Sequence, residues 1–220
     1  HAAETIHVLI IWLFTTFLPL PLVRYTFVFL THLLGGIGVY FCVLKLIPRH
    51  SQYQQMPSFI ALFGALYYLF NYATIQTYTV PFESFVIQFA VLPWLLYGLI
   101  TYLDRPSKKS YLVLTFLCIA SSAQYFIPTL FFGTTLIFVS LLFSKILSIR
   151  ANRLKLLTIV LGTYFLVNFY WLAPYVATLP HTAPVIKNAK FNEMSSENVI
   201  LNNQSRGSFL NVITLRGYLL

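Results

Sequence analysis

Charged side chains are scarce in this sequence, at 9% of its 220 residues, whereas hydrophobic residues make up 58%. Soluble globular domains carry about 25% charged residues, so this chain lacks the polar surface that water requires. Lipid suits a surface that avoids charge, because an ionised group there loses its hydration. The composition therefore argues against an ordinary soluble domain and predicts an integral membrane protein.

The sequence has only two cysteines and none of the common catalytic motifs. The two cysteines, Cys42 and Cys118, lie in apolar stretches, and no CxxC pair or Cys/His cluster accompanies them. A disulfide framework or a zinc site is therefore not indicated. A Walker loop, an HExxH motif and a nucleophile elbow are also missing, so this stretch gives no support to an ATP-driven pump.

Long apolar runs fill most of the chain. Six of them reach the length of about 20 helical residues that crosses a hydrocarbon core. They are 25–47, 58–75, 82–103, 110–127, 129–147 and 156–178. A seventh and shorter run, 6–22, is expected either to cross or to lie in the interface. Backbone in lipid must satisfy its own hydrogen bonds, so the sequence predicts an all-α, polytopic transmembrane bundle of about six or seven helices.

The composition changes near residue 179. The predicted transmembrane domain covers 1–178, and the segment 179–220, rich in Asn and Ser, is expected to begin an extracytoplasmic segment. The chain starts at His1 without a basic leader before its first apolar run. We therefore expect it to be part of a longer protein.

Basic residues occupy every second gap between the long runs. The three basic gaps hold Lys45 and Arg49, then Arg105, Lys108 and Lys109, then Lys145, Arg150, Arg153 and Lys155. The alternate gaps, 71–81 and 124–128, contain no Lys or Arg. The positive-inside rule therefore predicts a multi-pass protein of the cell membrane with cytoplasmic basic loops. Orientation also explains the net charge of +9 without a nucleic-acid partner.

Glu83 is the candidate catalytic residue, at the predicted outer end of the run 82–103. An ionisable group near membrane depth is a functional hypothesis by default. A half-buried carboxyl there would serve as a general base or a proton relay. The alternative is an interfacial acid that stabilises the N-terminus of a helix.

The predicted outer rim is rich in amides and aromatic rings. Rings can stack on the apolar face of a sugar, and amides can bind its hydroxyls. The candidate substrate-binding residues are Asn71, Tyr72, Gln76, Tyr78, Gln88 and Trp171. The alternative is an aromatic belt at the level of the lipid headgroups.

Three outer arginines are candidates to bind a lipid-linked phosphate, since a guanidinium can donate two parallel hydrogen bonds. They are Arg24, Arg206 and Arg216, and the alternative is solvated surface charge. His32 precedes three glycines, Gly35, Gly36 and Gly38. These glycines are expected to allow close helix packing, with His32 in an interhelical hydrogen bond.

Three segments together resemble a known family. They are 34–40 (LGGIGVY) with Lys45 and Arg49, 61–72 (ALFGALYYLFNY) with Leu92-Pro93-Trp94, and 208–218 (SFLNVITLRGY). This pattern resembles glycosyltransferases of the GT-C superfamily, in particular the membrane part of arabinofuranosyltransferase-like proteins of bacterial envelopes.

The resemblance implies transfer of a sugar from a polyprenyl-phosphate donor to an envelope glycan or glycoconjugate on the outer face. It implies a catalytic carboxylate in a first outer loop, which we expect upstream of His1. A divalent cation is left open, because the sequence shows no metal site. The alternative function is a membrane transporter or a flippase for lipid-linked sugars. It would require midplane polar groups and broken helices.

Overall fold

The computed structural model describes residues 4–47, 56–79, 81–125, 127–148 and 153–187. Almost all of these residues are helical, and the described ranges contain no strand, so the all-α prediction is confirmed. Contacts divide the chain into two units, 1–171 and 172–220. The second unit is described only over the end of one helix, and the site discussed below lies within the first.

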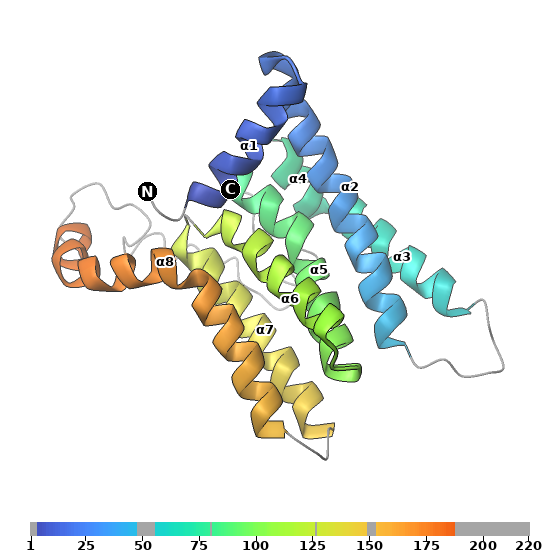
Figure 1. The fold of residues 1–220 in the computed structure, drawn as a ribbon. Helices are drawn as coiled ribbons and strands as arrows, with labels where there is room; N and C mark the ends of the chain where they lie inside the picture. The colour runs from blue at the N-terminus through green and yellow to red at the C-terminus, as the bar shows by residue number, and fades with distance from the viewer. Residues whose placement is uncertain (1–3, 48–55, 80, 126, 149–152, 188–220) are drawn as a thin grey trace, which may run out of the picture. The chain divides into compact units, whose positions relative to one another are not determined.

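The helices follow one another with short connections (Figure 1). They are α1 (Thr5–Phe17), α2 (Leu20–Leu46), α3 (Met56–Phe70), α4 (Tyr72–Thr79), α5 (Glu83–Asp104), α6 (Lys108–Ser121), the 3₁₀ turn η2 (Ser122–Gln124), α7 (Pro128–Ser148) and α8 (Arg153–Lys187).

Four helices are long and apolar enough to cross a membrane, namely α2, α5, α7 and α8. The pair α3 and α4, bent by 43°, makes a fifth if it is counted as one broken span. The predicted number of six or seven is therefore not confirmed. The 14 residues of α6 rise only about 21 Å, because the apolar run continues into a 3₁₀ turn instead of a longer helix. The 13 residues of α1 rise about 20 Å, which is also short of a full crossing.

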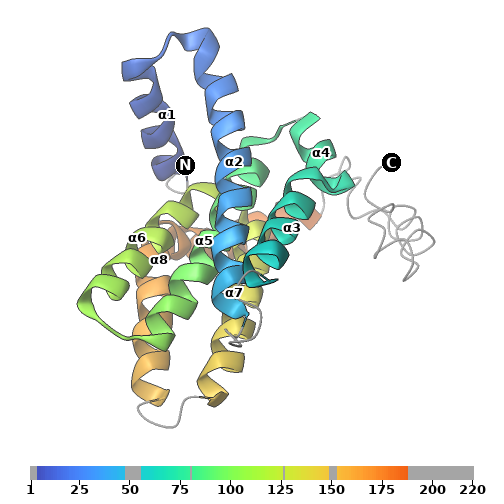
Figure 2. The same ribbon diagram turned by 90° about the vertical axis from the view of Figure 1, so that its right-hand side faces the viewer.

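The first helix folds back on the second (Figure 2). Leu18 and Pro19 form the turn between them, in an extended conformation that ends α1. Ile6, Ile10 and Phe14, which follow one face of α1, pack against a small core that contains Phe27 of α2. This packing places α1 beside α2 and the start of α5.

α5 is the central helix of the first unit. Its most apolar window is 61% buried, against 33% for the corresponding windows of α2 and α7. The glycines of α2 allow the close approach that the sequence predicted. An added Cβ at Gly38 would lie 2.9 Å from the Trp94 ring of α5, and one at Gly36 would lie 2.7 Å from Leu69 of α3. The Trp94 Nε1 also donates a 2.9 Å hydrogen bond to the carbonyl of Leu34.

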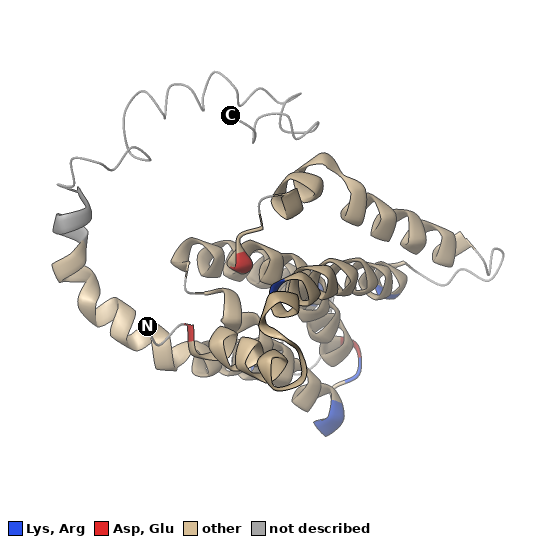
Figure 3. Cartoon of the chain, turned by 90° about the horizontal axis from the view of Figure 1, so that it is seen from above, with Lys and Arg blue, Asp and Glu red and all other residues tan. Residues whose placement is uncertain are grey.

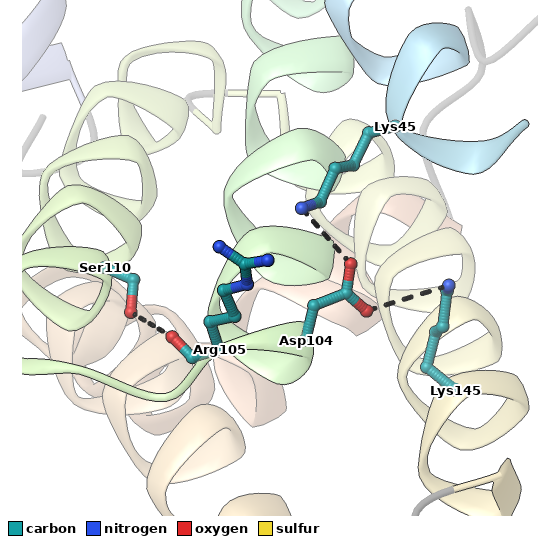
Figure 4. A network of polar contacts seen from close by, with 5 residues as sticks. All are labelled: Lys45, Asp104, Arg105, Ser110 and Lys145. Carbon is teal, nitrogen blue, oxygen red and sulfur yellow. Dashed lines mark hydrogen bonds and ion pairs between the residues drawn. The ribbon is translucent and has the colours of Figure 1, made fainter. Parts of the chain in front are cut away.

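Lysines from two helices meet at one end of the first unit, the basic end, around the last residue of α5. Asp104, the last residue of α5, joins the two (Figure 4). Its Oδ2 lies 3.3 Å from the Nζ of Lys45 on α2, and its Oδ1 lies 4.0 Å from the Nζ of Lys145 on α7. Lys45 at the end of α2, Asp104 at the end of α5 and Lys145 near the end of α7 therefore lie close together.

Large apolar side chains cover the outside of the described helices. Phe29, Phe63, Leu136 and Leu166 are each about 70% exposed or more. Charged positions along the same ribbon are few (Figure 3). An apolar surface of this extent is characteristic of a protein that contacts lipid.

Candidate functional site

A cavity of about 790 Å³ lies along the first half of α2. The α2 wall extends from Leu20 to His32, and Tyr78 and Thr79 at the end of α4, with Pro81, complete the lining. Its α2 residues include Leu20, Arg24, Val28 and His32, spaced four apart. Residues four apart share one helix face, so α2 presents a single stripe to the cavity.

Arg24 is the basic residue of this stripe. Arg24 is exposed and lies in the second turn of α2, close to the prolines at the start of the helix. His32 follows eight residues later, which is about 12 Å farther along the axis. The cavity therefore has a cation at one end and an imidazole at the other.

The inner end is built from stacked aromatic rings. The His32 ring lies parallel to Phe89, with centroids 5.7 Å apart, and Phe89 stacks in turn on Tyr68 at 4.1 Å. Tyr78 meets His32 edge-on at 4.5 Å. The Tyr68 hydroxyl donates a 2.9 Å hydrogen bond to the Phe89 carbonyl, which fixes this arrangement.

One polar atom at the inner end, the buried Nδ1 of His32, has no hydrogen-bond partner among the described residues. The buried hydroxyl of Tyr78 interacts with the Thr31 side chain on the same wall of α2. The interhelical hydrogen bond expected for His32 is thus not made by Nδ1. Buried polar atoms are nearly always partnered, so the Nδ1 of His32 is available to a polar group from outside the described part of the chain.

Glu83 pairs with a histidine that sequence reasoning did not select. The Nε2 of His7 on α1 lies 2.9 Å from the Oε2 of Glu83, whose side chain is 38% exposed. Glu83 is the first residue of α5, where the helix dipole favours an acid. It does not line the cavity, although Pro81 does. A histidine in an apolar run was the only signal for His7.

Asn71 lies at the break between α3 and α4. Its Nδ2 donates to the carbonyls of Tyr67 and Tyr68, each at 3.0 Å, and its Oδ1 accepts from the backbone N–H of Thr74 at 3.0 Å. Asn71 therefore satisfies backbone groups that the bend would leave open. Tyr72 is exposed and Gln76 is half-buried, and neither lines the cavity.

Gln88 and Trp171 belong to a different place, a polar cluster inside the first unit. Gln88 Nε2 donates to the Thr134 hydroxyl at 3.5 Å, and Trp171 Nε1 donates to Asn168 Oδ1 at 3.0 Å. The Tyr125 ring lies 6.0 Å from that of Trp171, and the Tyr125 hydroxyl lies 3.1 Å from that of Tyr164. The predicted rim is therefore divided: of the candidate residues that the structure describes, Tyr78 and Arg24 line the cavity and the others do not.

Two further predictions fall elsewhere. Arg206 and Arg216 lie outside the described residues. Within the described ranges, no group of three or more His, Cys, Asp or Glu side chains is placed to hold a metal ion.

No protein-family model, no curated protein and no solved structure matches this chain. The assignment of a function thus depends on the geometry of the cavity and on the chemistry of its lining.

Proposed function

We propose that this chain is the membrane part of a GT-C-type glycosyltransferase. It would take a sugar from a polyprenyl-phosphate donor and transfer it to an envelope glycan or glycoconjugate at the outer face of the cell membrane. The observation that carries the proposal is the cavity along α2, with Arg24 at one end and the unpartnered Nδ1 of His32 beside the Tyr78 hydroxyl at the other.

The lining fits the three parts of such a donor. The guanidinium of Arg24 suits the phosphate, to which it can donate two hydrogen bonds. Leu20 and Pro21, on the other side of Arg24 from His32, offer apolar contacts to the prenyl chain. The aromatic inner end suits the sugar, since rings bind its apolar face and the His32 and Tyr78 polar atoms can bind its hydroxyls.

The transfer itself needs a base. In the proposed step, the acceptor hydroxyl attacks the anomeric carbon, a carboxylate accepts the hydroxyl proton, and the lipid phosphate leaves with the electrons of the broken bond. Glu83 is the candidate for this base in the described part, and the Nε2 of His7 lies 2.9 Å from its carboxylate. Arg24 would stabilise the charge on the departing phosphate.

A second candidate function is transport of the same lipid-linked sugar. The observation that favours it is the 43° break between α3 and α4, because discontinuous helices line the substrate sites of many transporters. The two functions share the donor site but differ in product. A transferase makes a new glycosidic bond, whereas a flippase returns the donor unchanged on the other side.

The test is donor binding and transfer by the full-length protein in lipid nanodiscs, with a panel of polyprenyl-phosphate sugars. Arg24→Gln should weaken donor binding by about 10-fold or more, which is the usual effect of losing a hydrogen bond to a charged group. Arg105→Gln is the matched control, since Arg105 is exposed and does not line the cavity. Absence of binding across the panel, or equal losses in both variants, would contradict the proposal.

A further inference from the structure

A second cavity, of about 660 Å³, lies at the basic end of the first unit. The end of α5, the start of α6 and the first turns of α8 contribute to its walls. Lys108 and Lys155 line it from two different helices, and Leu103, Leu156 and Ile159 supply apolar wall. This cavity is separate from the first one, because the residues that line the two do not overlap.

The acid that also lines this cavity is already paired. The two carboxylate oxygens of Asp104 face Lys45 and Lys145, at 3.3 and 4.0 Å (Figure 4). Among the described residues, Lys108 and Lys155 form no ion pair. Both lysines are exposed and available to an anion that enters the cavity.

Local helix chemistry does not explain Lys108. It is the first residue of α6, whose first turn holds no acid, and the positive end of the helix dipole disfavours a cation there. The turn is stabilised by a capping box instead, in which Ser107 Oγ accepts from the Ser110 N–H at 3.1 Å and Ser110 Oγ accepts from the Ser107 N–H at 3.0 Å. Lysine at this position raises an already positive potential, which an external anion would offset.

We propose that this cavity binds the phosphate of an anionic membrane phospholipid, with Lys108 and Lys155 on the headgroup and an acyl chain along Leu156 and Ile159. Basic pockets between membrane helices are suited to anionic headgroups. The apolar wall beside the lysines favours a lipid over a soluble anion, because a free phosphate gains nothing from Leu156 or Ile159. This inference is independent of the function proposed for the first cavity.

The test is lipid binding to the full chain in detergent, measured by native mass spectrometry and by the melting temperature. The probes are phosphatidylglycerol, phosphatidylcholine and inorganic phosphate. Phosphatidylglycerol should bind and raise the melting temperature, and the Lys108→Gln/Lys155→Gln double variant should lose about 10- to 30-fold in affinity, as expected for two lysines near an anionic headgroup.

Lys109→Gln is the matched control, since Lys109 is an exposed neighbour on α6 that does not line the cavity. It should bind phosphatidylglycerol like the wild type. Melting of each variant without lipid checks that it is folded. Equal losses in Lys109→Gln, equal binding of phosphatidylcholine, or an equal effect of inorganic phosphate alone would each overturn the proposal.

Discussion

His7 Nε2 lies 2.9 Å from Glu83 Oε2, which links the short helix α1 to the first residue of the central helix α5. The two residues are far apart in sequence and meet because α1 folds back along α2 (Figure 2). α1 has 13 residues, fewer than the roughly 20 that cross a membrane. Its contact with Glu83 indicates that α1 packs against the start of α5.

Replacement of Glu83 by Gln tests its proposed role as a base. The amide keeps the shape of the side chain but cannot accept the acceptor proton, so the rate of transfer should fall by about 100-fold or more while donor binding stays within about 2-fold. Transfer rates and donor affinity in nanodiscs measure the two effects. Full activity in Glu83→Gln would show that the base lies elsewhere in the protein.

Replacement of Tyr78 by Phe separates a ligand-binding hydroxyl from a structural one. Within the described residues the Tyr78 hydroxyl interacts only weakly, with the Thr31 side chain, so its loss should lower the free energy of unfolding by no more than about 1 kcal/mol. Donor affinity should nevertheless fall by about 5-fold, the value of one neutral hydrogen bond. Unchanged affinity would remove Tyr78 from the site.

Tyr164→Phe is the corresponding structural variant. The Tyr164 hydroxyl lies 3.1 Å from both the Tyr125 and the Thr135 hydroxyls, and the residue is buried. Its removal leaves buried partners unsatisfied and should lower the free energy of unfolding by about 1–3 kcal/mol. Donor affinity should not change. Unfolding in mixed micelles compares this variant with Tyr78→Phe.

Two glycine substitutions test the packing of α2 on α5. A Cβ at Gly38 would lie 2.9 Å from the Trp94 ring, which a hydrogen bond to Leu34 holds in place, so Gly38→Ala should destabilise by about 1–3 kcal/mol. Gly133 of α7 has nothing within 4 Å of an added Cβ. Gly133→Ala should therefore be neutral or stabilise by up to about 1 kcal/mol. Equal melting temperatures for the two variants would argue against the close contact of α2 and α5.

The helical architecture could be predicted because long apolar runs can be read directly from the sequence, and backbone in lipid must form helices to satisfy its hydrogen bonds. The predicted run 82–103 became α5, Glu83–Asp104, and the run 25–47 became most of α2. The run 110–127 became a shorter helix, because its apolar composition does not register the 3₁₀ turn at Ser122–Gln124. The gap predicted at 71–81 begins at the observed break, but most of it is the helix α4, Tyr72–Thr79, because the Asn71 side chain supplies hydrogen bonds that let a second helix start directly after α3.

The candidate site was only partly predictable. The sequence predicts one site from the polar and aromatic residues near the outer ends of the apolar runs. In the structure, Gln88 contacts Thr134, whereas Tyr78 contacts His32 at a different place. Which faces meet depends on packing, such as the approach of α5 to Gly38, and a single sequence does not contain that information. Arg24 and Tyr78 were selected by their chemistry, and the cavity unites them.

The central claim is that the cavity along α2 opens away from the cytoplasm and holds a lipid-linked sugar. Thr79 lines this cavity and is exposed, whereas Cys42 and Cys118 are buried. A membrane-impermeant maleimide added to intact cells should therefore label Thr79→Cys, and a polyprenyl-phosphate sugar should slow that labelling. Failure to label from outside, or labelling at the same rate with and without every donor tested, would contradict the claim.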